Sequence, residues 1–246
     1  MVLAPVLAPP LQAQNKVINV VAAADMQPVF AEIGPVFERK THLKLKIVYG
    51  SSAALSTQLQ HGETADIFFS ADYSFAEQVV AAGLTDSGTP TPYAKGVLVL
   101  WARKDSRFQP LSLDDLQRKD LKSVAVANAD RAPYGRAAIA ALKKMNLFAN
   151  VAPHLVQAES VAQAAQFALS GNAELALTSQ TTAVSPRYRE VGNFVLFPQS
   201  QYQEIHQCAV VMKSAPNRNA AHLLLKFILS DQVQDNLKKL GLLPVQ

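Results

Sequence analysis

Residues 17–37, VINVVAAADMQPVFAEIGPVF, decide how the rest of the chain is interpreted. Ile18, Val20 and Val21 form the apolar, β-branched run of a strand that is covered on both faces, with Asn19 as its only polar interruption. Three alanines then remove the bulk from the end of this strand. Asp25 follows as a candidate N-cap, with Pro28 tolerated in the first helical turn. Because a helix N-terminus carries free N–H groups and partial positive charge, this turn predicts an anion site. Taken alone, the segment also fits an ordinary capped strand–helix unit.

The composition limits the class of protein. The 246 residues, 49% hydrophobic and 17% charged, supply enough apolar material for one large α/β domain or two smaller lobes. The 23 basic residues are scattered among 19 acidic ones without a basic run interleaved with aromatics, so nucleic-acid binding has little support. The single cysteine, Cys208, excludes an internal disulfide, and its apolar neighbours predict packing in a buried strand.

Residues 1–14, MVLAPVLAPPLQAQ, differ from the rest of the chain because they are apolar, broken by prolines and free of charge. They resemble the end of a secretory signal with a small-residue cleavage site near Ala13, although a basic n-region is missing. The run is too short for a membrane span, which needs about 20 apolar residues. We expect an exported, soluble mature protein. For residues 1–14 themselves, a truncated signal and a disordered tail remain open alternatives.

The strand–helix pattern repeats along the chain. A strand at residues 43–49 ends at Ser51 and Ser52 before a helical pattern, and a strand at 67–69 ends before Asp72, a good cap for the next helix. After an apolar strand at residues 96–102 and a polar connection, the pattern begins again. Further strands are expected at residues 124–127, 155–157, 175–178 and 208–212, with helices at 136–144, 160–171 and 221–237 and a turn-rich loop at 128–135.

This order predicts an α/β fold of two Rossmann-like lobes joined by a hinge that the chain crosses twice. We expect lobe 1 to comprise residues 15–100 and 205–246, and lobe 2 to comprise residues 101–204. The carboxyl ends of strands from both lobes would then line a cleft, which is where such folds bind ligands.

The sequence offers no recognisable catalytic constellation. The five histidines show no HExxH motif and no cysteine partner, which argues against a zinc site, and GxSxG, P-loop and GxGxxG motifs are missing. Hydroxyls gather instead at the ends of predicted strands, in Ser51, Ser52 and residues 178–182. Without a histidine base they suit hydrogen-bond donation better than nucleophilic attack, although capping explains any single serine. We therefore expect a binding protein without a cofactor, and not an enzyme.

Five segments, in their order and spacing, resemble the periplasmic molybdate- and tungstate-binding proteins of ABC importers. The likeness covers nearly everything from Asn15 to the C-terminus. It implies a class II periplasmic-binding fold that closes over a tetrahedral oxyanion held by neutral donors and helix N-termini, with no free metal cation. The segments are AAADM at 22–26, YGSSAAL at 49–55, ADIFFSAD at 65–72, APYG at 132–135 and AESVAQA at 158–164.

The resemblance also implies where the ligand binds. Ser52, with Ser51 beside it, would donate hydroxyl protons. Tyr134 would contribute its backbone N–H, with its hydroxyl as a further candidate, and Val161 would contribute the N–H at the start of a helix capped by Ser160. Ser179 occupies a position where some relatives have tyrosine. Asp25 occupies the end of the first strand, where relatives have Ser or Asn.

Asp25 is the main departure from the family pattern, because a carboxylate accepts hydrogen bonds and repels a dianion. Its side chain could turn back to cap its own helix, or it could accept a proton that the ligand carries. We favour capping, since Asp is among the best N-cap residues.

We expect a monomeric, periplasmic binding protein that delivers molybdate or tungstate to a membrane permease. Two alternatives remain open: a binding protein for hydrogen phosphate or another protonated oxyanion, and a ligand-sensing effector domain of a transcription regulator. The effector domain is disfavoured because no helix-turn-helix precedes Asn15.

Overall fold

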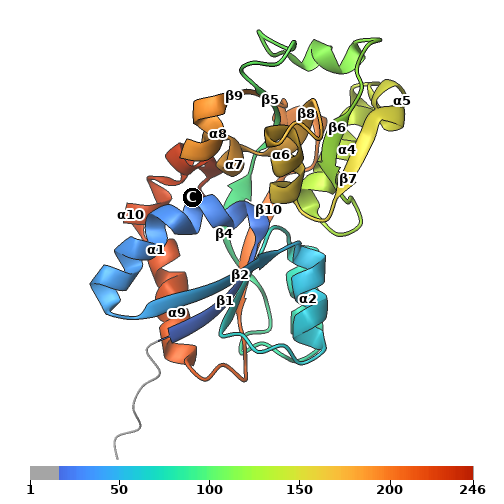
Figure 1. Ribbon diagram of the computed structural model, residues 1–246. Helices are drawn as coiled ribbons and strands as arrows, with labels where there is room; N and C mark the ends of the chain where they lie inside the picture. The colour runs from blue at the N-terminus through green and yellow to red at the C-terminus, as the bar shows by residue number, and fades with distance from the viewer. Residues whose placement is uncertain (1–16, 246) are drawn as a thin grey trace, which may run out of the picture.

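The computed structural model describes residues 17–245, which form two β-sheets with helices packed around each (Figure 1). We call the six-stranded sheet and its helices lobe 1, and the five-stranded sheet and its helices lobe 2. The segment for which we expect a signal remnant or a tail, residues 1–14, lies outside the described residues. Within residues 17–245, no helix has the length and apolar character that crossing a membrane requires.

The sheet of lobe 1 is built on the first strand–helix units of the sequence. Its first strand β1 (Val17–Ala23) lies next to the edge strand and pairs in parallel with β2 (Lys44–Gly50) on one side and β3 (Ile67–Ser70) on the other. Successive side chains of β1 point to opposite faces, so both faces of the strand need covering. The remaining strands run antiparallel and give the order β11-β4-β10-β3-β1-β2, with β4 (Thr91–Gly96), β10 (Ile205–Val211) and β11 (Leu242–Leu243).

The sheet of lobe 2 repeats the arrangement. Its central strand β8 (Leu175–Ser179) pairs in parallel with β6 (Val124–Ala127) and antiparallel with β5 (Leu98–Arg103). The outer strands are β7 (Leu155–Ala158), parallel to β6, and β9 (Gly192–Leu196), antiparallel to β5. In both lobes the parallel strands therefore end at an edge where helices begin.

The chain changes sheets twice, first at Val97, between β4 and β5, and again between β9 and β10. The single strand predicted at residues 96–102 is therefore mainly β5, and its first residue, Gly96, ends β4 in the other sheet. The expected division of the lobes after residue 100 stays a prediction. Strands β4, β9 and β11 were not predicted from the sequence.

Helices cover both faces of each sheet. In lobe 1, α1 (Gln27–Thr41) and α9 (Arg218–Ile228) pack on the face that carries Ile18 and Val20, while α2 (Ser52–Gln60) and α3 (Tyr73–Ala81) pack on the face that carries Val21. Lobe 1 also contains the short helix α10 (Asp231–Gln234). The helices of lobe 2 are α4 (Pro133–Lys144), α5 (Phe148–Val151), α6 (Val161–Leu169), α7 (Gln180–Val184) and α8 (Pro186–Val191).

The predicted caps of two helices are confirmed. The Asp72 carboxylate accepts a hydrogen bond of 3.3 Å from the N–H of Phe75, and the Ser160 hydroxyl accepts one of 3.2 Å from the N–H of Gln163. The helix predicted from Arg136 in fact begins at Pro133, so the predicted loop is shorter. Proline suits the first helical position because that position needs no donor.

Candidate functional site

Helix starts from both lobes surround a small cavity between the two sheets. The volume that the centre of a water molecule can occupy in this cavity is about 10 Å³. The cavity is lined by residues 23–25, 50–52, 71, 132–134 and 160–161. These residues come from the end of β1 and from the starts of α2, α4 and α6. A space of this size holds about one water molecule, so a larger occupant needs the two lobes to move slightly apart.

The backbone N–H groups at these helix starts are the first donors of the site. Helices α2, α4 and α6 begin at Ser52, Pro133 and Val161, all of which line the cavity. The first N–H groups of a helix have no acceptor within the helix, so they are available to another partner. Three helix N-termini directed at one space favour a negatively charged occupant.

Serine hydroxyls add a second set of donors. The Ser52 hydroxyl accepts a hydrogen bond of 3.0 Å from the N–H of Ala71, and the Ser51 hydroxyl, which caps α2, accepts one of 3.4 Å from the N–H of Ala54. Ser160, the cap of α6, also lines the cavity. Since each oxygen acts as an acceptor toward the backbone, each hydroxyl keeps its own proton for a further acceptor.

Asp25 is the only charged side chain among the residues that line the cavity, and it is completely buried. Its Oδ2 accepts a hydrogen bond of 3.1 Å from the hydroxyl of Tyr134, and a second one from the amide of Gln207. Its Oδ1 has no hydrogen-bond partner among residues 17–245. Burial raises the pKa of this carboxyl to about 6, against the opposing effect of the two donated hydrogen bonds.

The prediction that Asp25 caps its own helix is wrong. A short 3₁₀ turn, η1 (Ala24–Met26), separates β1 from α1, so Asp25 lies inside a helical turn and not in front of one. The N-cap residues are Ala23 for η1 and Met26 for α1, and neither helix has a side-chain cap. Hydrogen bonds from Tyr134 and Gln207 orient the carboxylate instead. The hydroxyl of Tyr134, a candidate donor to the ligand, thus donates its proton to Asp25.

Five of the six predicted site residues lie together around the cavity. Asp25, Ser51, Ser52, Tyr134 and Val161 line it, and their role in ligand binding stays a prediction. Ser179 does not belong to the lining. Its hydroxyl caps α7 and lies 2.9 Å from the hydroxyls of both Thr181 and Thr182.

Two residues that sequence reasoning missed support Asp25. Gln207 donates to its carboxylate, and Thr181 donates a hydrogen bond of 2.7 Å to its backbone carbonyl. The one signal in the sequence for Gln207 is its position directly before the apolar run that starts at Cys208. Thr181 belongs to the hydroxyl cluster at residues 178–182, in which the resemblance indicated Ser179 as the ligand residue.

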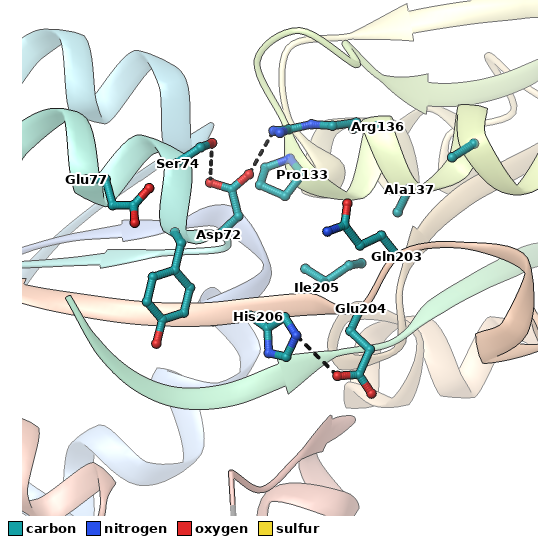
Figure 2. Close-up of a pocket in the computed structure, with 12 residues that line it drawn as sticks. Asp72, Ser74, Glu77, Pro133, Arg136, Ala137, Gln203, Glu204, Ile205 and His206 are labelled. Carbon is teal, nitrogen blue, oxygen red and sulfur yellow. Dashed lines mark hydrogen bonds and ion pairs between the residues drawn. The ribbon is translucent and has the colours of Figure 1, made fainter. Parts of the chain in front are cut away.

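A wider groove of about 320 Å³ lies between the lobes, lined by α3, the first turns of α4 and the segment that returns to β10 (Figure 2). In it, Arg136 of α4 forms an ion pair of 2.7 Å with Asp72, the cap of α3. The N–H of Ala53 also donates a hydrogen bond of 3.2 Å to the carbonyl of Arg131 in lobe 2. Together with the contacts of Asp25, these interactions hold the lobes closed around the cavity.

Comparison with known proteins gives the family. A family model described as bacterial extracellular solute-binding protein matches residues 18–243, which is nearly the whole described chain. The chain belongs to this family. It has the two-lobed α/β architecture that the sequence predicted. A solved relative confirms this fold class. The periplasmic molybdate-binding protein of Azotobacter vinelandii superimposes with a TM-score of 0.84 at 26% identity, covering 93% of this chain and 100% of that one.

Relatives by sequence point in the same direction. This solute-binding protein is 33% identical to a molybdate-binding protein ModA of Rhodobacter capsulatus, over 93% of this chain and 88% of that protein. The substrate-binding domain of a putative molybdenum ABC transporter from Clostridium difficile has a TM-score of 0.70 at 26% identity, covering 94% of this chain and 99% of that one. The resemblance stated from the sequence motifs is therefore confirmed at the level of the family.

Proposed function

We propose that this solute-binding protein captures a tetrahedral oxyanion, molybdate or tungstate, in the cavity between its lobes and delivers it to an ABC permease in the membrane. The observation that carries the proposal is the convergence of three helix N-termini and the hydroxyls of Ser51 and Ser52 on one small cavity. Two relatives named for molybdate binding support the choice of anion.

The donor set explains how an anion would be held without a cation. No lysine or arginine lines the cavity, so a bound oxyanion would be held by the N–H groups of Ser52, Tyr134 and Val161 and by the Ser52 hydroxyl. Such donors are fixed in direction and discriminate by the size of the occupant. Molybdate and tungstate have nearly the same size, and we expect the site to accept both, while the smaller sulfate reaches fewer donors.

We further propose that the protein acts outside the cytoplasm, as a monomer, and that binding and release are its activity in place of catalysis. The relatives named as periplasmic or as parts of ABC transporters support this placement. The serine hydroxyls of the cavity have backbone groups as their hydrogen-bond partners, and none has a histidine partner among residues 17–245, so they fit donation to a ligand. Closure of the lobes would create the surface that a permease recognises.

Thermal unfolding with a panel of oxyanions tests the proposal. Ligand-stripped protein at about pH 6 would be heated with molybdate, tungstate, sulfate or no addition. At about 100 times the dissociation constant, a ligand that binds only the native state adds roughly 2.7 kcal/mol, which is several degrees for a chain of this size. We expect a shift with molybdate and tungstate and none with sulfate. Folded, empty protein that responds to neither metal oxyanion would contradict the proposal.

A further inference from the structure

The unpartnered oxygen of Asp25 is an exception in a site made of donors. Asp25 lines the cavity, is completely buried, and its Oδ1 makes no hydrogen bond to any part of the chain that the structure describes. A buried acceptor without a partner is costly, so an oxygen left free beside a ligand cavity indicates a bond made with the ligand.

The surroundings of Asp25 determine what that bond can be. The polar groups that face it are neutral: Tyr134 from α4, Gln207 from β10, Thr181 from α7, and the buried Tyr93 from β4. No ion pair involves Asp25 within residues 17–245. An ionised carboxylate next to a dianion would therefore meet unscreened repulsion in a low-dielectric space.

One proton removes this repulsion, and the hydrogen bonds to Oδ2 favour the other oxygen as its position. Tyr134 and Gln207 both donate to Oδ2, so a proton shared with the ligand belongs on the Oδ1 side. We propose that the cavity binds its oxyanion together with one proton, held in a hydrogen bond between Asp25 Oδ1 and a ligand oxygen. This inference rests on the proposed function as an oxyanion-binding site and adds a proton to the ligand that the site selects.

The source of the proton depends on the anion. Molybdate carries none near neutral pH, so Asp25 must take one from solvent, and this becomes costly above its pKa of about 6. Hydrogen phosphate brings its own proton and can donate it to an ionised Asp25. In the same position an asparagine would offer a permanent N–H donor, which mimics protonated aspartate at every pH.

Titration calorimetry of the wild type and Asp25→Asn with molybdate, at about pH 6 and about pH 8, tests the inference. One coupled proton changes affinity about tenfold per pH unit above the pKa. We expect wild-type affinity to fall about 50- to 100-fold between the two pH values and about one proton to be taken up per molybdate at pH 8, as measured in buffers of different ionisation enthalpy. Asp25→Asn should bind molybdate equally at both.

The matched control is Asp66→Asn. Asp66 is also a fully buried carboxylate of lobe 1, but its oxygens accept hydrogen bonds from the backbone N–H groups of Asn19 and Asn217, and it does not line the cavity. Its variant should keep the wild-type dependence of affinity on pH. Equal wild-type affinity at both pH values without proton uptake, or a pH dependence that persists in Asp25→Asn, would overturn the inference.

Hydrogen phosphate separates this inference from the proposed function. Phosphate is about as small as sulfate but can donate a proton to Asp25, so we expect it to bind the wild type at about pH 8, more weakly than molybdate binds at about pH 6. It should lose at least tenfold in affinity in Asp25→Asn, because two donors would then face each other. Wild type that binds phosphate but never molybdate would refute the proposed anion and leave the shared proton supported. Molybdate binding with the same affinity at both pH values would support the proposed anion and refute the shared proton. The failure of both anions to bind would refute both proposals.

Discussion

The hydroxyl of Tyr134, in lobe 2, donates a hydrogen bond of 3.1 Å to the Asp25 carboxylate, in lobe 1, although the two residues are 109 positions apart in the chain. Glycine makes this contact possible. A Cβ placed on Gly96, at the end of β4, would lie only 2.4 Å from the Tyr134 hydroxyl oxygen. The contact between Tyr134 and Asp25, which both line the cavity, therefore depends on a glycine at the first crossing between the lobes.

Gly96→Ala should weaken both closure and binding. The added methyl group would displace the Tyr134 ring and its hydrogen bond to Asp25, and overpacking of this kind costs about 1–3 kcal/mol. Chemical denaturation of ligand-free protein and calorimetry with molybdate would measure the two effects. Gly88→Ala is the control, because a Cβ there meets nothing within 4 Å. A Gly96→Ala protein with wild-type affinity would show that Tyr134 is not held by this contact.

Ser52→Ala and Ser51→Ala should have different effects. Ser51 is the N-cap of α2, so its loss should lower the free energy of unfolding by about 1 kcal/mol. We expect Ser52→Ala to weaken molybdate binding by about 1.5–3 kcal/mol, as for a hydrogen bond to a charged partner, with a smaller effect on the ligand-free protein. Both quantities would be measured for both variants. Loss of stability in Ser52→Ala that equals its loss of affinity would mean that Ser52 is structural.

The ligand-free protein should become less stable through Asp25 as pH rises. The folded-state pKa of about 6 lies above the ordinary aspartate value of 3.8, so the native state binds this proton more tightly than the unfolded state does. The stabilising contribution is complete below the unfolded pKa and is lost as pH rises through the folded one, a change of about 2–3 kcal/mol. Urea denaturation should show that the free energy of unfolding of Asp25→Asn minus that of the wild type rises between about pH 4 and pH 6 and levels off by about pH 8. A difference that stays constant over this range would contradict the assignment.

Cys208→Ala should spare binding. The thiol is buried within the core cluster of α2, α3 and β10, and its Sγ lies 3.3 Å from the carbonyl oxygen of Asp72, outside the cavity lining. We expect a loss of about 1 kcal/mol in the free energy of unfolding, as for an ordinary substitution in a core, and unchanged affinity for molybdate. A selective loss of binding in a fully stable variant would place the ligand elsewhere.

Local patterns predicted most of the strand–helix units and the cavity residues that are set by them. The strand–helix pattern placed Ser52 and Val161 at helix starts, at the edge of each sheet that lines the cavity. Tyr134 was expected in the loop at residues 128–135 and became a candidate only through the family resemblance, because the helix starts three residues earlier than its apolar pattern indicates. Strand β4 was missed because its residues, TPYAKG, show no apolar alternation and include proline. Ser179 was placed wrongly with respect to the cavity because its hydroxyl satisfies a local cap and its threonine neighbours.

The orientation of Asp25 could not have been predicted in this way. Aspartate at a helix start favours the N-cap position. In this structure, however, Tyr134 and Gln207, which are distant in sequence, donate hydrogen bonds to its Oδ2 atom. Capping propensity describes a free helix end, whereas the environment of this carboxyl is decided only when the two lobes meet. At Asp25, the residue that departs from the family pattern, tertiary contacts therefore outweigh the local preference for a helix cap.

Crystallography of the protein with tungstate tests the central claim most directly, because tungsten scatters anomalously and is located without reference to the protein atoms. We predict one strong anomalous peak between the lobes, within hydrogen-bonding distance, through its oxygens, of the Ser52 hydroxyl and the backbone N–H groups of Tyr134 and Val161. A peak only in the groove beside Arg136 and Asp72, or no ordered tungsten in crystals grown with excess tungstate, would contradict it.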